Sequence, residues 1–279
     1  MHLLSILELS LAEDGPDLTT EGVFGPGDRL QAIIVAKEQT IIAGLPVIPL
    51  VMDLCAAHPE ELSYTWQSLA KEGEEVAKGS IVARISGPAR QVLRAERVIL
   101  NFVSHLCGIA NLTRRYAEKL EGTGVRLLDT RKTMPGLRVL EKYAVKAGGC
   151  SNHRFNLSDG VLIKDNHIRA AGSIAAAVDM ARRYAPFVLK IEVECEDMDM
   201  VRDAVAAGAD IIMLDNMEPA AMREAVDYIA GRAIVEASGN MAKRDIREVA
   251  ETGVDVISVG ALTHSVEALD ISLKFISQN

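Results

Sequence analysis

Three short basic segments stand out in this chain because their residue types could bind and activate an anion. They read DTRKT at 129–133, NHR at 152–154 and KDNH at 164–167, in a chain whose formal net charge is −9. The first and third segments directly follow apolar, strand-like runs at 125–128 and 161–163. Since side chains at the ends of parallel strands often form active sites, these positions predict a pocket for a small polyanion.

The composition limits the kinds of partner that such a pocket could serve. Apolar residues make up 49% and charged residues 25% of the 279 residues, which is typical of a globular enzyme. Aromatic residues make up only 4% and the pI is near 5.3, so stacking on bases and binding to a phosphate backbone are not expected. We therefore predict a small-molecule substrate and no nucleic-acid partner.

The cysteines and the hydropathy pattern predict a cytoplasmic protein. The four cysteines show no C-x-x-C spacing, which indicates free thiols in a reducing compartment and argues against structural zinc. Residues 1–14 are apolar but lack a basic start, so they predict an amphipathic helix rather than a signal peptide. No apolar run approaches the roughly 20 residues that span a bilayer, so no membrane partner is expected.

A rhythm of strand followed by helix begins at residue 125 and predicts the fold that positions the basic segments. Helical patterns at 137–147, 199–207, 220–230 and 244–252 alternate with strand-like runs. Such repeats imply a parallel sheet with right-handed connections, and their spacing favours a closed or nearly closed α/β barrel. A doubly wound sheet is the alternative, but no G-x-G-x-x-G follows the first strand. The strand-like runs end near Asp129, Lys164, Glu194, Asp215, Glu236 and Gly260.

The part of the chain before residue 87 mixes a short helix with strands and a hairpin. The hairpin is predicted at 71–79, where Gly73 and Gly79 mark turns. The strand-like runs lie at 31–36, 40–43 and 80–85.

A long helix is predicted to begin at 86–88, with Pro88 in its first turn. Its polar residues recur at helical spacing and share one stripe, which is either a solvated face or a functional one. The stripe contains Arg94, Arg97, Asn101 and His105.

The predicted strand ends divide into three chemical groups. The early strands end in cations, the middle strands in carboxylates, and the late strands in small residues whose backbone N–H groups suit phosphate. Each group also has a plainer explanation: loop cations can be solvated, a carboxylate can cap a helix, and a serine–glycine pair can form an ordinary turn. The groups are Arg131, Lys132 and Lys164; Glu192, Glu194 and Asp215; and Ser238–Gly239 with Gly260–Ala261.

Two glutamates share one face of a predicted strand. Glu192 and Glu194 alternate with the apolar Ile191 and Val193, so both point to the same side. If that side is the barrel interior, burying their charge is costly unless the function uses it.

Together these motifs resemble the quinolinate phosphoribosyltransferase family. The resemblance rests on the combination of TRKT, NHR and KDNH, with further matches that span most of the chain. The family's usual Ser-Gly-Gly reads Ser238, Gly239 and Asn240 here, so the role of Asn240 in a phosphate loop stays open. The further matches are AERVILNF at 95–102, PGL at 135–137, KYAV at 142–145, IEVE at 191–194, MLDN at 213–216, EASG at 236–239 and SVGALTH at 258–264.

The resemblance implies a fold, an assembly and a reaction. It implies an N-terminal α/β sandwich at 1–99, completed by 266–279, and an incomplete seven-stranded α/β barrel at 100–265. The assembly would be a homodimer with shared active sites, or a higher oligomer. The implied reaction transfers phosphoribosyl from phosphoribosyl pyrophosphate to quinolinate with Mg²⁺ as cofactor. It gives nicotinate mononucleotide, pyrophosphate and carbon dioxide in NAD biosynthesis.

The resemblance also implies roles for individual residues. Lys132, Lys164, Glu194 and Asp215 are expected to be catalytic, with Glu194 and Asp215 holding Mg²⁺ directly or through water. Guanidinium groups suit the dicarboxylate quinolinate, while cations and backbone N–H groups suit pyrophosphate and the 5′-phosphate. The expected substrate-binding residues are Arg97, Thr130, Arg131, Lys132, His153, Arg154, Lys164, His167, Glu194, Asp215, Ser238, Gly239, Asn240, Val259, Gly260 and Ala261.

Two other functions stay open at this point. One is a paralogous phosphoribosyltransferase that acts on another heteroaromatic acid. The other is a non-catalytic, phosphate-sensing scaffold that retains the fold. Quinolinate-dependent release of pyrophosphate would separate all three.

Overall fold

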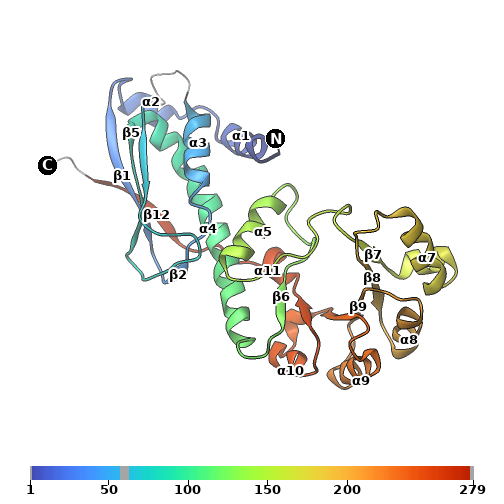
Figure 1. Ribbon diagram of the computed structural model, residues 1–279. Helices are drawn as coiled ribbons and strands as arrows, with labels where there is room; N and C mark the ends of the chain where they lie inside the picture. The colour runs from blue at the N-terminus through green and yellow to red at the C-terminus, as the bar shows by residue number, and fades with distance from the viewer. Residues whose placement is uncertain (1, 57–62, 277–279) are drawn as a thin grey trace. The chain divides into compact units, whose positions relative to one another are not determined.

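The computed structural model describes residues 2–56 and 63–276, and the chain forms two compact units (Figure 1). The first unit comprises Met1–Arg114, Met134–Gly149 and Ser265–Asn279. The second comprises Arg115–Thr133 and Cys150–His264. The predicted domain boundaries, 1–99 with 266–279 and 100–265, remain a prediction. Residues 1 and 277–279 of the predicted first domain lie outside the described residues, as do 57–62.

An antiparallel sheet with the strand order β12-β1-β5-β3 forms the centre of the first unit. β1 (Arg29–Ala36) pairs with β5 (Ile81–Pro88) on one side and with β12 (Ile271–Ile276) on the other. The C-terminal segment therefore completes the sheet of the N-terminal part, as the resemblance implies. The other elements are α1 (His2–Asp14), α2 (Leu18–Val23), β2 (Thr40–Ile41), α3 (Val47–Cys55), β3 (Thr65–Ser68) and β4 (Glu75–Val76).

The long helix α4 (Ala89–Lys119) carries a buried apolar face and a polar stripe. Arg97 is exposed on that stripe, and His105 is half-buried. Gly108 allows a close approach within the first unit, since a Cβ there would lie 2.3 Å from the carbonyl oxygen of Glu267. The predicted start of this helix is too early. Pro88 is the last residue of β5, and the helix begins directly after it at Ala89. The same unit contains α5 (Arg138–Ala147).

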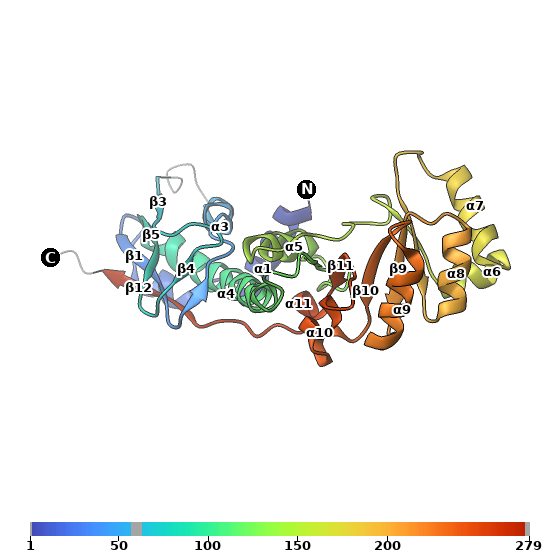
Figure 2. The same cartoon turned by 60° about the horizontal axis from the view of Figure 1, so that its bottom comes forward.

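The second unit is an incomplete α/β barrel built on six parallel strands in the order β6-β11-β10-β9-β8-β7 (Figure 2). The end strands β6 and β7 do not pair with each other. A single parallel bridge joins Leu128 of β6 to Ser151, so the structure has one bridge where the resemblance implies a seventh strand. The strands are β6 (Arg126–Leu128), β7 (Val161–Ile163), β8 (Ile191–Cys195), β9 (Ile211–Asp215), β10 (Ile234–Ser238) and β11 (Val256–Ser258).

Helices connect the strands and cover the outside of this sheet, as parallel connections require. They are α6 (Asp165–Ala171), α7 (Ile174–Tyr184), α8 (Met198–Ala206), α9 (Pro219–Ile229), the short 3₁₀ helix η2 (Met241–Lys243), α10 (Ile246–Ala250) and α11 (Ala261–His264). Within the described residues, no helix combines the length and the apolar character needed to cross a membrane.

Candidate active site

The second unit contains a cavity of about 340 Å³ at the carboxyl ends of its strands. It contains most of the predicted strand-end cations and carboxylates, which come from residues far apart in sequence. The barrel brings them together because the ends of its parallel strands meet at one rim. The lining residues are Thr130, Arg131, Lys132, His153, Arg154, Leu162, Lys164, Glu194, Met213, Asp215, Glu236, Ser238 and Ser258.

Two guanidinium groups form the cationic side of the cavity. Arg154 is half-buried, and its Nη1 donates to the carbonyl oxygen of Gly160 at 2.7 Å. Burial lowers the pKa of Arg154, and the nearby charge of Arg131 lowers it further. Two cations held close together in a partly buried place favour a ligand that carries more than one negative charge.

The segment around Lys132 is fixed by hydroxyl groups. The backbone N–H of Lys132 donates to Oγ1 of Thr130 at 3.0 Å, and Thr263 Oγ1 donates to the Lys132 carbonyl oxygen at 2.8 Å. A Cβ on Gly260 would lie 3.0 Å from Lys132 Cδ, so the small residue leaves room for the lysine side chain. The TRKT motif and the loop after β11 therefore hold each other in place.

Carboxylates from two neighbouring strands also line the cavity. Lys164 Nζ forms an ion pair with Glu194 Oε2. Asp215, at the end of β9, accepts a 2.6 Å hydrogen bond at Oδ2 from the side-chain amide of Asn216. Glu194 and Glu192 point to the same side of β8, as their alternation predicted. That side is the barrel interior, since each lines a cavity inside the second unit.

The loop after β10 has a conformation that only a glycine can adopt. Gly239 has φ +88°, and a Cβ there would lie 2.4 Å from Oδ1 of Asn216. The same Oδ1 accepts a 2.9 Å hydrogen bond from Asn240 Nδ2, so Asn216 connects Asp215 to this loop. Gly239 and Asn240 lie next to cavity-lining Ser238 but are not among the lining residues, and the same holds for Val259, Gly260 and Ala261 beside Ser258.

Two further predicted site residues, His167 and Arg97, are also absent from the lining of the cavity. His167 is exposed in the first turn of α6, and its Nδ1 accepts the backbone N–H of Lys164 at 2.9 Å. That ring therefore caps its own helix. Arg97 is exposed on α4 in the first unit.

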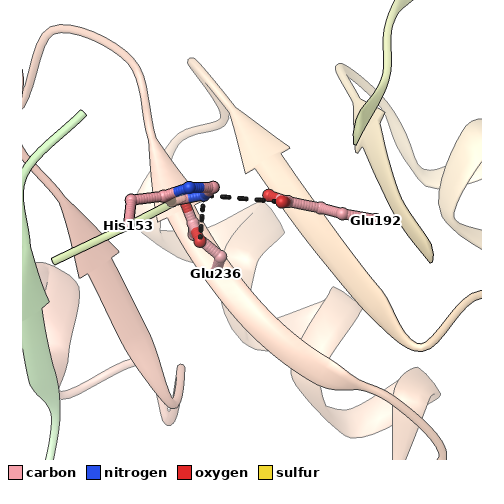
Figure 3. Close-up of side chains that lie close together, drawn as sticks. All are labelled: His153, Glu192 and Glu236. Atoms are coloured by element: carbon pink, nitrogen blue, oxygen red, sulfur yellow. Dashed lines mark ion pairs between the residues drawn. The ribbon is translucent and has the colours of Figure 1, made fainter. Parts of the chain in front are cut away.

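At the wall of the cavity, a histidine and two buried glutamates point toward one another (Figure 3). His153 Nε2 lies 3.4 Å from Glu192 Oε2 and 3.5 Å from Glu236 Oε2. Burial lowers the pKa of the His153 ring, and hydrogen bonds to the two carboxylates act in the opposite direction. Burial raises the pKa of Glu192, and the charge of Glu236 adds to this.

The second ring nitrogen decides how the proton is distributed. The backbone N–H of Arg154 donates to His153 Nδ1 at 2.8 Å. A proton on Nδ1 would set two N–H groups against each other, so Nδ1 holds a lone pair in this geometry. The ring is therefore neutral, with its proton on Nε2.

The three side chains form the one group among the described residues whose ligand atoms lie close enough to hold a metal ion. A metal would need the lone pair of Nε2, and that atom carries the proton in this geometry. The donor at Nδ1 thus argues for a hydrogen-bonded cluster rather than a metal site.

Four residues of the site were not assigned a role from the sequence. Glu236 and Ser258 line the cavity, Asn216 connects two loops, and Asp129 is fully buried. Asp129 Oδ1 accepts the backbone N–H of His153 at 2.9 Å. The position of Glu236 at the end of a predicted strand could have indicated a place in the site. The contacts of Asn216 depend on loop geometry, which the sequence does not show.

Comparisons with known proteins agree with this arrangement. Residues 17–107 match the N-terminal domain of quinolinate phosphoribosyl transferase, and residues 109–274 match its C-terminal domain. A probable nicotinate-nucleotide pyrophosphorylase (carboxylating) of Bacillus subtilis is 44% identical over 92% of this chain and 87% of its own. A chloroplastic nicotinate-nucleotide pyrophosphorylase (carboxylating) of Arabidopsis thaliana is 38% identical over 98% of this chain and 82% of its own.

Solved structures show the same fold. NadC from Streptococcus pyogenes has a TM-score of 0.88 at 42% identity and covers 98% of this chain and 96% of its own. The nicotinate-nucleotide pyrophosphorylase from Francisella tularensis has a TM-score of 0.90 at 36% identity, covering 99% and 96%. The fold, the two domain matches and the relatives agree along nearly the whole chain, which therefore belongs to the quinolinate phosphoribosyltransferase family.

Proposed function

We propose that this chain transfers phosphoribosyl from phosphoribosyl pyrophosphate to quinolinate and releases pyrophosphate and carbon dioxide, giving nicotinate mononucleotide for NAD biosynthesis. The observation that carries the proposal is a single cavity lined by two guanidinium groups together with carboxylates from neighbouring strands. Family membership supports the same reaction.

The cationic side suits quinolinate. A planar guanidinium can bind a carboxylate through two parallel hydrogen bonds, and quinolinate carries two carboxylates on one ring. Arg131 and Arg154 would bind them, with Lys132 and His153 close by. Arg97 would complete the set from a partner subunit.

The carboxylate side suits the sugar and the leaving group. Glu194 and Asp215 would bind ribose hydroxyls and favour the positive charge that develops at the anomeric carbon. Lys164, now paired with Glu194, would turn to the departing pyrophosphate, with His167 next to it. Backbone N–H groups of the loops at 238–240 and 259–261 would bind the 5′-phosphate.

The carboxylates also fit Mg²⁺. Glu194 and Asp215 lie on neighbouring strands and offer the oxygen ligands that this ion prefers, directly or through water. When bound, the ion would offset negative charge on pyrophosphate.

Loss of carbon dioxide follows from ring chemistry. Once the ring nitrogen is ribosylated it is cationic, so it can stabilise the electron pair left on the adjacent carbon as its carboxylate departs. A proton then replaces the carboxylate. The chain's cations would hold the remaining carboxylate and keep the ring in place during this step.

The decisive assay measures pyrophosphate release from phosphoribosyl pyrophosphate with and without quinolinate. Quinolinate-dependent release supports the proposal. Release only with another heteroaromatic acid would favour a paralogous enzyme, and binding without release would favour a phosphate-sensing scaffold. The comparisons favour neither alternative.

We further propose a cytoplasmic homodimer, or a higher oligomer, in which Arg97 serves the neighbouring subunit. The test mixes the inactive variants Arg97→Ala and Lys132→Ala under conditions that allow subunit exchange. If Arg97 acts across the interface, each heterodimer has one intact pocket and recovers about half the wild-type activity. No recovery, with exchange confirmed by native mass spectrometry, would overturn the shared site.

A further inference from the structure

Arg154 lies in a stretch of chain that has no helix or strand of its own. Residues 152–160 form turns and irregular backbone between the bridge at Ser151 and β7. Regular hydrogen bonding therefore cannot fix the position of this guanidinium. Side-chain contacts have to do so, because an unanchored loop samples many conformations.

The anchors of this stretch are carboxylates. Asp129 accepts the backbone N–H of His153 at Oδ1 and the side-chain amide of Asn152 at Oδ2, at 2.9 and 2.6 Å. His153 in turn accepts the backbone N–H of Arg154 at Nδ1. Its other nitrogen, Nε2, faces Glu192 and Glu236.

The two glutamates come from rigid strands and are costly to bury. Glu192 lies on β8 and Glu236 on β10, and their side chains are 5% and 4% exposed. In each glutamate, Oε2 faces the shared N–H of His153, while Oε1 makes no hydrogen bond among the described residues. Buried carboxylate oxygens without a hydrogen bond lower stability, so their presence calls for a functional reason.

Both nitrogens of His153 are thus occupied by protein groups. The ring lines the cavity, but its N–H is already shared with the two carboxylates, and its other nitrogen accepts the Arg154 N–H. This geometry fits a residue that acts through its neighbour better than one that grips the substrate itself.

Building on the function proposed above, we propose that Glu192 and Glu236 are positioning residues of the dicarboxylate site. They hold the His153 ring through Nε2–H, and the ring holds the backbone of Arg154, which binds a carboxylate of quinolinate. The specificity of the site for a planar aromatic dicarboxylate would then depend on two residues that do not touch the ligand.

The first test measures hydrogen exchange of the Arg154 backbone amide in the intact protein without substrate. The double variant Glu192→Leu/Glu236→Leu, which removes both acceptors of the His153 N–H, and the variant His153→Phe should each speed this exchange by about tenfold or more, because the chain of contacts is broken. Glu236→Gln keeps an acceptor oxygen and should leave the exchange close to wild type. Glu141→Gln, made in the buried histidine–glutamate pair of the first unit, is the matched control and should change nothing at Arg154.

The second test is a double-mutant cycle on quinolinate affinity, measured by calorimetry and as the KM for quinolinate. His153→Phe should weaken binding on the order of tenfold in the wild-type background but less than about threefold when Arg154 is already Lys, because both changes remove the same interaction. The KM for phosphoribosyl pyrophosphate should stay unchanged, whereas general structural damage would change both KM values.

Two results would overturn the proposal. One is unchanged Arg154 exchange in both Glu192→Leu/Glu236→Leu and His153→Phe. The other is an equal loss of quinolinate affinity from His153→Phe in both backgrounds, which would mean that His153 binds the ligand directly. If the wild-type protein shows no quinolinate-dependent release of pyrophosphate, the proposed function is wrong. The exchange test would still show whether the two glutamates hold Arg154 through His153.

Discussion

The chain buries two histidine–glutamate clusters, and they differ in how well their carboxylates are satisfied. In the first unit Glu141 is fully buried, and both of its oxygens are used: Oε1 pairs with His105 Nε2 at 2.9 Å and Oε2 accepts the Met134 N–H at 3.1 Å. In the second unit Glu192 and Glu236 share one histidine N–H at longer distances, and each has one oxygen without a hydrogen bond.

This difference separates a structural contact from a functional one. A buried carboxylate that accepts two hydrogen bonds fixes local structure, and its removal leaves donors unsatisfied. Two carboxylates that compete for one proton lower stability, and they are retained beside a cavity lined by Arg154 and Lys132. Proteins accept such costs where the site needs them.

The largest expected effect is on the Glu141 side of the comparison. Glu141→Leu removes the acceptor for both His105 and the Met134 N–H, so the free energy of unfolding should fall by about 2 to 3 kcal/mol. Urea unfolding followed by circular dichroism measures this loss. A fall below about 0.5 kcal/mol would mean that water replaces the carboxylate, and the pair would no longer count as structural.

The same substitution in the second cluster should act in the opposite direction. Glu236→Leu removes one of two competing carboxylates and leaves Glu192 on the His153 N–H. The free energy of unfolding should stay equal or rise by about 1 kcal/mol, as when buried charge is replaced by apolar packing. A loss as large as that of Glu141→Leu in the same urea experiment would erase the distinction between the two clusters.

The sequence predicted the orientation of Glu192 better than the contact of Glu236. Alternation with apolar residues placed Glu192 on the same face as Glu194, because strand periodicity shows which side chains share a face, but it left open whether that face is the barrel interior. It could not show that Glu236, two strands away in the sheet, meets the same histidine, since that contact depends on how the strands curve around the barrel. Asn216 was missed for a similar reason, because its contact to Asn240 joins two loops.

The fold was easier to predict than the contacts. Repeated strand–helix units predicted a barrel, which the structure has, and the predicted strand-end cations line one cavity in it. Element boundaries shifted by one or two residues, as at Pro88, because a strand can run up to the proline that precedes a helix. Domain completion by β12 came from the resemblance, since no local pattern links residues so far apart.

The pH dependence of stability should also differ between the clusters. Burial, followed by the charge of Glu236, raises the pKa of Glu192, so the native protein binds this proton more tightly than the unfolded chain. The stability that it contributes is complete below the ordinary pKa of 4.5 and is lost as pH rises through the raised value. Glu192→Gln cannot titrate, so its stability relative to wild type should improve with rising pH.

The improvement should not exceed about 1.4 kcal/mol per pH unit, the limit for one proton. Urea unfolding of both proteins at about pH 5 and about pH 8 measures it, with Glu141→Gln as the control. A constant difference between wild type and Glu192→Gln across this range would show that Glu192 does not hold an additional proton.

The smallest expected change is at the His153 ring itself, which should keep one protonation state throughout. Its Nδ1 accepts the Arg154 N–H and its Nε2–H is shared by Glu192 and Glu236, so neither nitrogen can gain or lose a proton without breaking a contact. NMR of the ring nitrogens between about pH 6 and about pH 8 should show a neutral ring protonated at Nε2. In Glu236→Leu the same tautomer should persist, because Glu192 still accepts the proton. A doubly protonated ring would mean that the carboxylates prevail over the Arg154 N–H. That N–H would then have lost its acceptor, and the link from the buried glutamates to the guanidinium would have to run through a different atom.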